Sequence, residues 1–205
     1  MKGNPAAILG FALVGLVQPG LLAIRFVILG PVGLVCPPWQ RILETYFSSY
    51  TINPAYTRRM NDSDRRELWL SQVWILVFWS AAIASAWAGW LPWRVFAIWY
   101  GILAAICVVS NVRTLFSHHY DSEGHALGRA AQVMDSIDTP GAWWTELWAP
   151  VGFRYHALHH LAPHIPYHNM GRAYRRLKAV LPSDAVYRAS TSPGTWASFR
   201  ALWRG

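Results

Sequence analysis

The chain has 205 residues, of which 54% are hydrophobic and only 14% charged, and its formal net charge is +8. A chain of this length can bury a substantial core. The basic residues lie between and after the apolar segments instead of forming one stripe with exposed aromatics, so nucleic acid is the least favoured partner. Cys36 and Cys107 have no paired spacing, so the sequence supports neither a disulfide framework nor a zinc knuckle.

The first predicted element is an apolar region at residues 6–35, in which Arg25 is the only charge. The triplet Gln18-Pro19-Gly20 interrupts this region, and such a triplet is a strong helix breaker. The interruption and the lack of an Ala-x-Ala site argue against a signal peptide. We expect either one kinked span with an interfacial piece or a re-entrant hairpin, and the pattern does not choose between them.

A polar, basic linker at residues 36–67 comes next, with short helix signals at 38–47 and a loop at Asn53-Pro54. The run Asn61-Asp62-Ser63-Asp64 predicts a helix N-cap with an acidic first turn. Residues 68–92 carry no charge, and a bilayer core needs about 20 such residues. We predict transmembrane helices at 68–90 and 95–112, joined by a tight turn at residues 90–93.

The short turn predicts that these two helices are antiparallel neighbours, so the linker and everything after Arg113 lie on one side. That side carries most Lys and Arg residues, which indicates the cytoplasm. The predicted fold class is all-α and integral to the membrane: a helical hairpin, an N-terminal apolar segment that is kinked or re-entrant, and a helical cytoplasmic His-rich tail. The membrane region is 1–112 and the His-rich region is 113–205.

All eight histidines lie in this tail. His156, His159 and His160 have the spacing i, i+3 and i+4, so a helix would project all three from one face, as a metal chelate requires. His118 follows the second hairpin helix and could join them at the mouth of the hairpin. Imidazole suits iron, zinc or copper, and the residues alone do not choose among these metals.

Five segments carry a family resemblance: SSYTINPAYTRRM (48–60), GWLPWR (89–94), NVRTLFSHHY (111–120), QVMDS (132–136) and LWAPVGFRYHALHHLAPHIPYHNMGRAYRRL (147–177). With these segments the chain resembles the membrane fatty acid desaturases, in particular their proteobacterial branch, over nearly its whole length. The segment around the histidines is the most specific. The resemblance implies a di-iron centre, held by three histidine boxes, that activates O₂ to remove two hydrogens from an acyl chain.

The resemblance assigns metal ligands residue by residue. His156, His159 and His160 match the third box, and His118 matches the additional histidine after the last transmembrane helix. These four are the predicted iron ligands.

Three further residues are candidates for supporting these ligands. His168 lies in a PYH triplet that looks like a family feature, and Asp135 could orient a ligand histidine, although an exposed acidic residue is an equal alternative. Asn111 could bond a metal-bound water or simply cap a helix end. His119, His125 and His164 are expected to be solvated surface imidazoles.

The chain departs from the family pattern in one large respect. The first two histidine boxes should precede the first apolar region, and no histidine precedes His118. Four ligands are too few for two irons. The chain is therefore expected to correspond to the C-terminal part of a desaturase, inactive alone, with the other boxes lost by truncation, left out of a fragment, or supplied by a missing N-terminal half on another chain.

The resemblance also implies partners and a location. These are a membrane lipid or acyl substrate, a ferredoxin or cytochrome b5-like electron donor, and the bacterial inner membrane with the tail cytoplasmic. The basic residues Arg172, Arg175, Arg176 and Lys178 could dock an acidic donor or head groups, and a solvated basic helix is the alternative. Two other functions stay open: an acyl or carotenoid hydroxylase or ketolase on the same scaffold, and a non-enzymatic membrane metal-binding or interaction protein.

Overall fold

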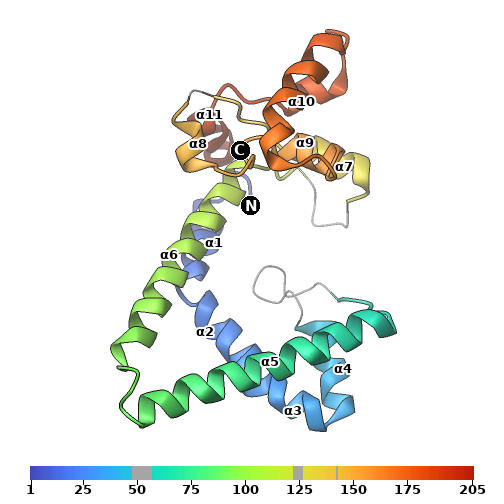
Figure 1. The fold of residues 1–205 in the computed structure, drawn as a ribbon. Helices are drawn as coiled ribbons and strands as arrows, with labels where there is room; N and C mark the ends of the chain where they lie inside the picture. Colours follow the sequence, from blue (N-terminus) through green and yellow to red (C-terminus); the bar gives the residue numbers. More distant parts are fainter. Residues whose placement is uncertain (48–56, 122–126, 142) are drawn as a thin grey trace. The chain divides into compact units, whose positions relative to one another are not determined.

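The computed structural model describes residues 1–47, 57–121, 127–141 and 143–205 (Figure 1). The predicted loop at Asn53-Pro54 and the residue His125 lie outside these ranges. Within them the regular elements are helices, and three are long and apolar enough to cross a membrane. The predicted class, an all-α integral membrane protein, is confirmed. The described residues form two compact units, one of residues 14–108 and one of residues 1–13 with 109–205.

In the unit of residues 14–108, a short 3₁₀ turn, η1 (Val14–Leu16), leads into the first membrane helix. That helix consists of α2 (Gln18–Ala23), the π-helical turn η2 (Ile24–Leu29) and α3 (Gly30–Val35), which follow one another without a break. Pro19 lies in its first turn, where a missing N–H costs nothing. The triplet predicted to break the apolar region therefore lies in the first turn of a helix that is long and apolar enough to span a membrane.

Helix α4 (Pro37–Tyr46) follows, and α3 packs against it and against α5 (Asp62–Trp87). The side chain of Asn61 accepts a hydrogen bond from the Asp64 N–H at 2.8 Å, which confirms the predicted N-cap. Helix α5 ends at Trp87, before the predicted residue 90, because Gly89 adopts a left-handed conformation with φ +79°.

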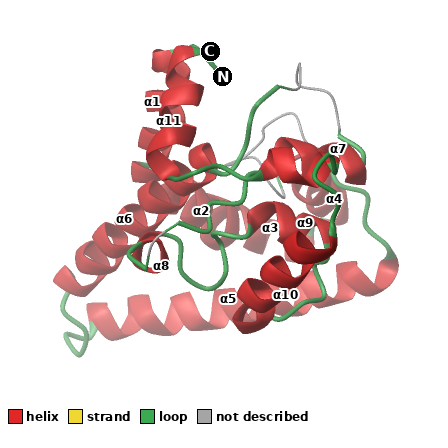
Figure 2. Ribbon diagram, turned by 90° about the horizontal axis from the view of Figure 1, so that it is seen from above, coloured by secondary structure: helices red, strands yellow, loops and turns green. Residues whose placement is uncertain are grey.

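Helix α6 (Arg94–Phe116) follows the turn and runs past the predicted end at Val112. Ring contacts join the two helices close to this turn, between Trp79 and Phe96 with centroids 6.1 Å apart and between Trp87 and Trp93 at 5.8 Å. Beyond it, α5 and α6 diverge at an open angle instead of lying side by side as predicted (Figures 1 and 2).

The other unit holds every described histidine. Its elements are α1 (Pro5–Leu13), the end of α6, α7 (Arg129–Asp135), α8 (Thr145–Trp148), α9 (His156–Leu161), α10 (Tyr167–Val180), the 3₁₀ turn η3 (Val186–Ser190) and α11 (Thr195–Arg204). One core cluster joins Val133, Tyr155, Leu158, Met170 and Tyr187, and a second joins Ile8, Leu115 and Leu202. Helix α7 packs on α9 and η3 in the first of these clusters.

The last residue of α7 and the extended residues after it, 135–139, form backbone hydrogen bonds to several other parts of this unit. Their backbone N–H groups donate in turn to three separate parts of the chain: Ile137 to Ser117 at 2.8 Å, Asp138 to Ser190 at 2.6 Å, and Thr139 to Arg154 at 2.7 Å. We call residues 135–139 the bridging segment. It fixes the chain after α6 beside the chain that enters α9, and so brings His118 toward the H-x-x-H-H sequence.

Candidate metal centre

Three histidine side chains converge beside the bridging segment. His118 follows α6, His156 is the first residue of α9, and His160 lies one turn later on the same helix. The Nε2 atom of His156 is 3.1 Å from that of His118 and 3.2 Å from that of His160. Among the described residues these three form the group with metal-ligand geometry, with one nitrogen from each inside a 4.8 Å span.

Burial keeps the central imidazole neutral. Burial first, and then charge repulsion from the neighbouring His118 and His160 rings, lower the pKa of His156 to about 3. The pKa of His160 is lowered for the same reasons, burial first. A metal binds neutral imidazole, so both rings are in their ligating form at neutral pH.

Asp135 fixes the third ring. Its Oδ2 atom is 2.9 Å from Nδ1 of His118, and its Oδ1 atom accepts a hydrogen bond from the Tyr120 N–H at 2.9 Å. Burial alone would raise the pKa of Asp135, but the hydrogen bond and the charge of His118 leave it below its usual value. With Nδ1 engaged by a carboxylate, Nε2 of His118 is the nitrogen directed at His156, which is the arrangement that orients metal-ligating histidines.

The donor set fits a transition metal in part. Three neutral imidazole nitrogens that face one another suit iron, zinc or copper. They do not complete two coordination spheres, since each iron needs several ligands. The described residues therefore supply part of one metal coordination sphere.

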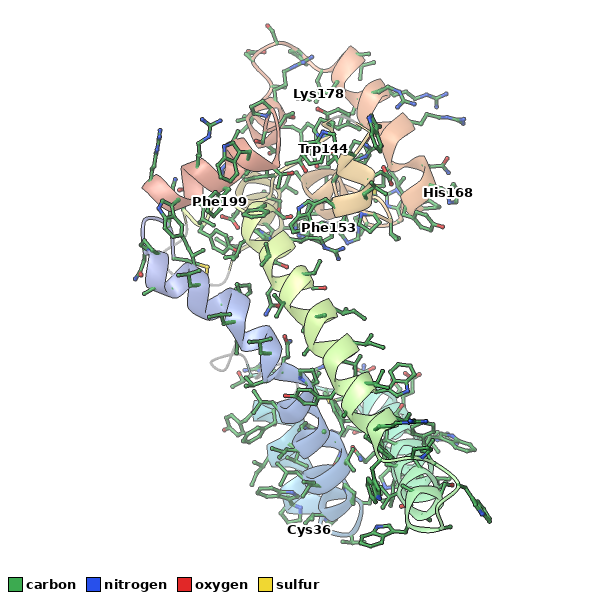
Figure 3. All side chains as sticks on the ribbon, turned by 90° about the vertical axis from the view of Figure 1, so that its left-hand side faces the viewer. Cys36, Trp144, Phe153, His168, Lys178 and Phe199 are labelled. Carbon is green, nitrogen blue, oxygen red and sulfur yellow. The ribbon has the colours of Figure 1, made fainter. Side chains whose placement is uncertain are left out.

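The other predicted site residues lie apart from this group. His159, the fourth predicted ligand, is exposed and is not in the group of converging nitrogens, although its ring centroid is 5.8 Å from that of His160. His168 and His164 are exposed on or beside α10, and Figure 3 shows His168 on that helix. Asn111 lies inside α6, not at a helix end, and its Nδ2 donates to the carbonyl of Phe11 in α1 at 3.0 Å.

A buried carboxylate that the sequence did not single out supports the helix with the histidines. The side chain of Asp138 is fully buried, and its Oδ1 atom accepts the N–H groups of Ala157 at 2.9 Å and Leu158 at 3.2 Å, in the first turn of α9. Its Oδ2 atom accepts the hydroxyl of Tyr187. Asp138 thus caps α9 from a distant part of the chain, and an acidic residue in a loop sequence gives no sign of that role.

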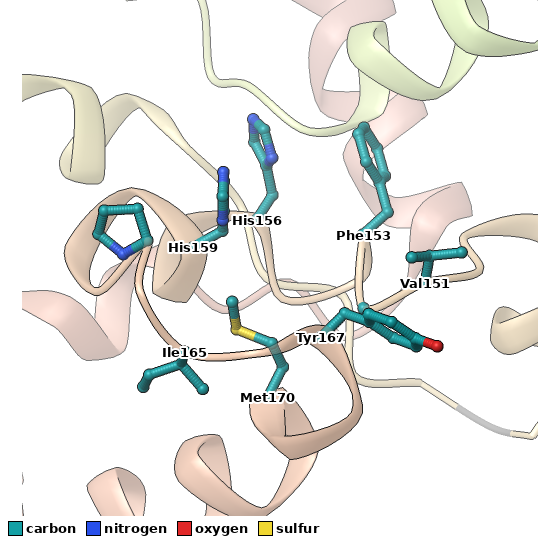
Figure 4. Close-up of a pocket in the computed structure, with 9 residues that line it drawn as sticks. Val151, Phe153, His156, His159, Ile165, Tyr167 and Met170 are labelled. Atoms are coloured by element: carbon teal, nitrogen blue, oxygen red, sulfur yellow. The ribbon is translucent and has the colours of Figure 1, made fainter.

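A cavity of about 240 Å³ opens beside the histidines. His156 and His159 form one side, and the rest of its wall is mainly apolar, with Val151, Phe153, Pro163, Ile165, Tyr167 and Met170 (Figure 4). The Phe153 ring lies 5.1 Å from that of His156. An apolar chain could therefore lie next to His156.

The chain is similar to known proteins over most of its length. The family model for fatty acid desaturases matches residues 26–191. A ceramide hydroxylase of Caulobacter vibrioides (strain NA1000 / CB15N) is 36% identical over 204 residues, which cover 98% of this chain and 58% of that protein. The chain thus spans less than two thirds of this relative. No solved structure matches.

Proposed function

Because the chain belongs to the fatty acid desaturase family, we propose that it supplies His118, His156 and His160 to an iron centre that oxidises the acyl chain of a membrane lipid. The observation that carries this proposal is the convergence of three imidazole nitrogens within 4.8 Å, two of them kept neutral by burial. Iron bound there supplies the activation of O₂. His159 and the two further boxes expected from the family complete the ligand set.

Hydroxylation is the first reaction to test. The relative that aligns with 98% of this chain is named for hydroxylation of a ceramide. Inserting one oxygen atom of O₂ into a C–H bond consumes two electrons and two protons and gives an alcohol and water. The electrons come from a separate donor, of the ferredoxin or cytochrome b5 type.

Desaturation is the second candidate, and the description of the family supports it. It consumes the same O₂, electrons and protons, but gives an alkene and two waters. The two reactions need the same ligands and differ in where the acyl chain lies, so product identity distinguishes them and the ligand residues do not.

The residues of this chain have three tasks in either reaction. Asp135 holds the His118 ring with Nε2 toward the centre. Burial around His156 keeps that ring unprotonated. The apolar wall of the cavity, formed by residues such as Val151 and Ile165, accommodates methylene groups and excludes water next to His156.

The outer face of α10 is the surface we propose for the electron donor. Arg172, Arg175 and Arg176 are exposed there, which suits an acidic partner. Lys178 is not part of this surface, because its Nζ atom lies 5.7 Å from the rings of both Tyr174 and Tyr187. We further propose that this unit faces the cytoplasm of a bacterial inner membrane, in accord with its basic residues.

The test is a product assay on the purified, iron-loaded protein in lipid. We expect no product from the chain alone, and product when a second polypeptide supplies the two missing boxes, with ceramide, reductant and O₂ present. Gain of one oxygen in the lipid, measured by mass spectrometry, identifies hydroxylation, and loss of two hydrogens identifies desaturation.

The matched variants are His156→Ala, which should abolish product, and His164→Ala, which should not. Metal binding without product in every combination would instead favour the non-enzymatic metal-binding protein.

A further inference from the structure

Helix α11 packs on the end of a membrane helix. Leu202 of α11 is buried in one cluster with Leu115 of α6, and the ring of Phe199, which Figure 3 labels, meets that of Phe116 edge-on with centroids 5.6 Å apart. Leu115 and Phe116 are the last residues of α6, which is apolar enough to cross a bilayer. The contact therefore places α11 at the depth where the membrane span ends.

One side of α11 carries exposed aromatic rings. Trp196 is 64% exposed and Trp203 39% exposed, and both contact the ring of Phe199, at 5.2 Å and 5.5 Å. Tryptophan is enriched where the polar head groups meet the hydrocarbon, because its ring is apolar and its N–H is polar. This side of the helix is suited to lie in the membrane interface.

The next side of the same helix is basic. Arg200 and Arg204 are one turn apart and exposed, and with Lys2 and the small residues Ala197 and Ala201 they line a shallow, open hollow of about 480 Å³. The Gly3 N–H donates to the Leu202 carbonyl at 2.8 Å, which holds Lys2 beside the helix. Lys2 has an acidic partner, Asp121 at 2.7 Å, whereas no described acidic residue forms an ion pair with Arg200 or Arg204.

We propose that this hollow binds the phosphate of an anionic phospholipid, with Arg200 and Arg204 as its charged ligands and the aromatic side of α11 in the membrane interface. Arginine forms paired hydrogen bonds with phosphate, and two guanidinium groups more than balance the single negative charge of a phospholipid phosphodiester. Because α11 packs on the end of a membrane helix, the hollow lies beside lipid head groups, which favours a lipid phosphate over a phosphate ion in solution. This proposal is independent of the reaction at the histidines.

Lipid selectivity tests the proposal directly. The purified chain is placed in nanodiscs made from an equal mixture of phosphatidylcholine and phosphatidylglycerol, and the lipids it retains are counted by native mass spectrometry. We expect phosphatidylglycerol to be preferred, and Arg200→Gln with Arg204→Gln to lower that preference about tenfold or more. The pair Arg200→Lys with Arg204→Lys keeps the charge and should retain most of it.

The control is Arg172→Gln with Arg176→Gln, which removes two exposed charges one turn apart on α10. An equal loss in this control would overturn the proposal, because the preference would then reflect net charge alone. So would an unchanged preference in the α11 variant, or its loss in the Lys variant. Displacement of phosphatidylglycerol by excess inorganic phosphate would also overturn it, because the site would then serve a soluble anion. A thermal melt of each variant shows that it is folded.

Discussion

The carboxylate of Asp138 and the hydroxyl of Tyr187, 49 positions apart in sequence, form a buried hydrogen bond beneath α9. The same carboxylate caps the first turn of that helix through Ala157 and Leu158. The orientation of His156 and His160 thus depends on a side chain that does not contact either ring.

Replacing Asp138 with alanine should destabilise the unit that holds the histidines. The change leaves two backbone N–H groups and a hydroxyl without an acceptor, and each unmet buried group costs about 1–3 kcal/mol, so we expect a loss of about 3 kcal/mol or more. Thermal unfolding in detergent measures it. The exposed Asp184→Ala is the control, and an equal effect there would contradict the role of Asp138.

The free energy of unfolding should depend on pH through the titration of Asp138. Burial raises its pKa from 3.8 to about 6, so between these values the folded chain holds a proton that the unfolded chain has lost. Stability therefore falls as pH rises through this window, by up to about 3 kcal/mol, and the fall is complete above the folded pKa. The difference in melting temperature between wild type and Asp138→Asn, followed with pH, isolates this contribution. A constant difference would exclude it.

Asp135→Asn should weaken metal binding without removing a ligand. Loss of a carboxylate that orients a ligand histidine typically lowers metal affinity about 10- to 100-fold. Co²⁺ titration followed by absorbance measures the affinity of the purified chain. His164→Gln, on an exposed imidazole, serves as the control and should bind Co²⁺ as the wild type does.

His159 and His160 should differ in the same titration. His160 belongs to the converging group, whereas His159 is exposed and lines the cavity. In the chain alone, His160→Ala should lower Co²⁺ affinity strongly and His159→Ala weakly. Once the missing boxes are supplied, both substitutions should reduce turnover if His159 is a ligand of the completed centre. Equal losses of Co²⁺ affinity from the two substitutions in the chain alone would contradict this difference between His159 and His160.

Gly152→Ala should destabilise the loop that leads into α9. Gly152 has φ +73°, and an added Cβ would lie 3.1 Å from the Tyr167 carbonyl oxygen. A left-handed conformation costs a residue with a side chain about 1–2 kcal/mol, so we expect at least that loss in a thermal melt. Gly101→Ala meets no atom within 4 Å in a helix and should be neutral or stabilising.

The sequence predicted those features of the fold that depend on local chemistry. The cap at Asn61 follows from the preferences of single residues. The triplet with Pro19 was predicted to be a helix breaker, whereas Pro19 lies in the first turn of α2, a position that proline also favours. The end of α6 was placed too early because hydropathy marks where apolar residues stop, whereas the helix continues to Phe116. The angle between α5 and α6 could not be predicted, because a short turn fixes how close two helix ends are and not their direction.

For the candidate site, too, the sequence predicted the features that depend on local spacing and not those that depend on distant contacts. Helical spacing identified His156 and His160, and the bond between Asp135 and His118 is the contact expected of an orienting carboxylate. Helical spacing could not show which of His159 and His160 faces His118, because this depends on where the rest of the chain places His118. Asp138 was missed because its role comes from contacts with residues far along the chain.

The bridging segment has a consequence for how the metal would bind. His118 and His156 are 38 positions apart, and bringing them together in a flexible chain would carry the entropic cost of closing that loop. The backbone hydrogen bonds of residues 135–139 close this loop when the chain folds, so metal binding does not have to close it. The histidines are thus held at high effective concentration toward one another, and the unit would bind a metal as a preorganised receptor.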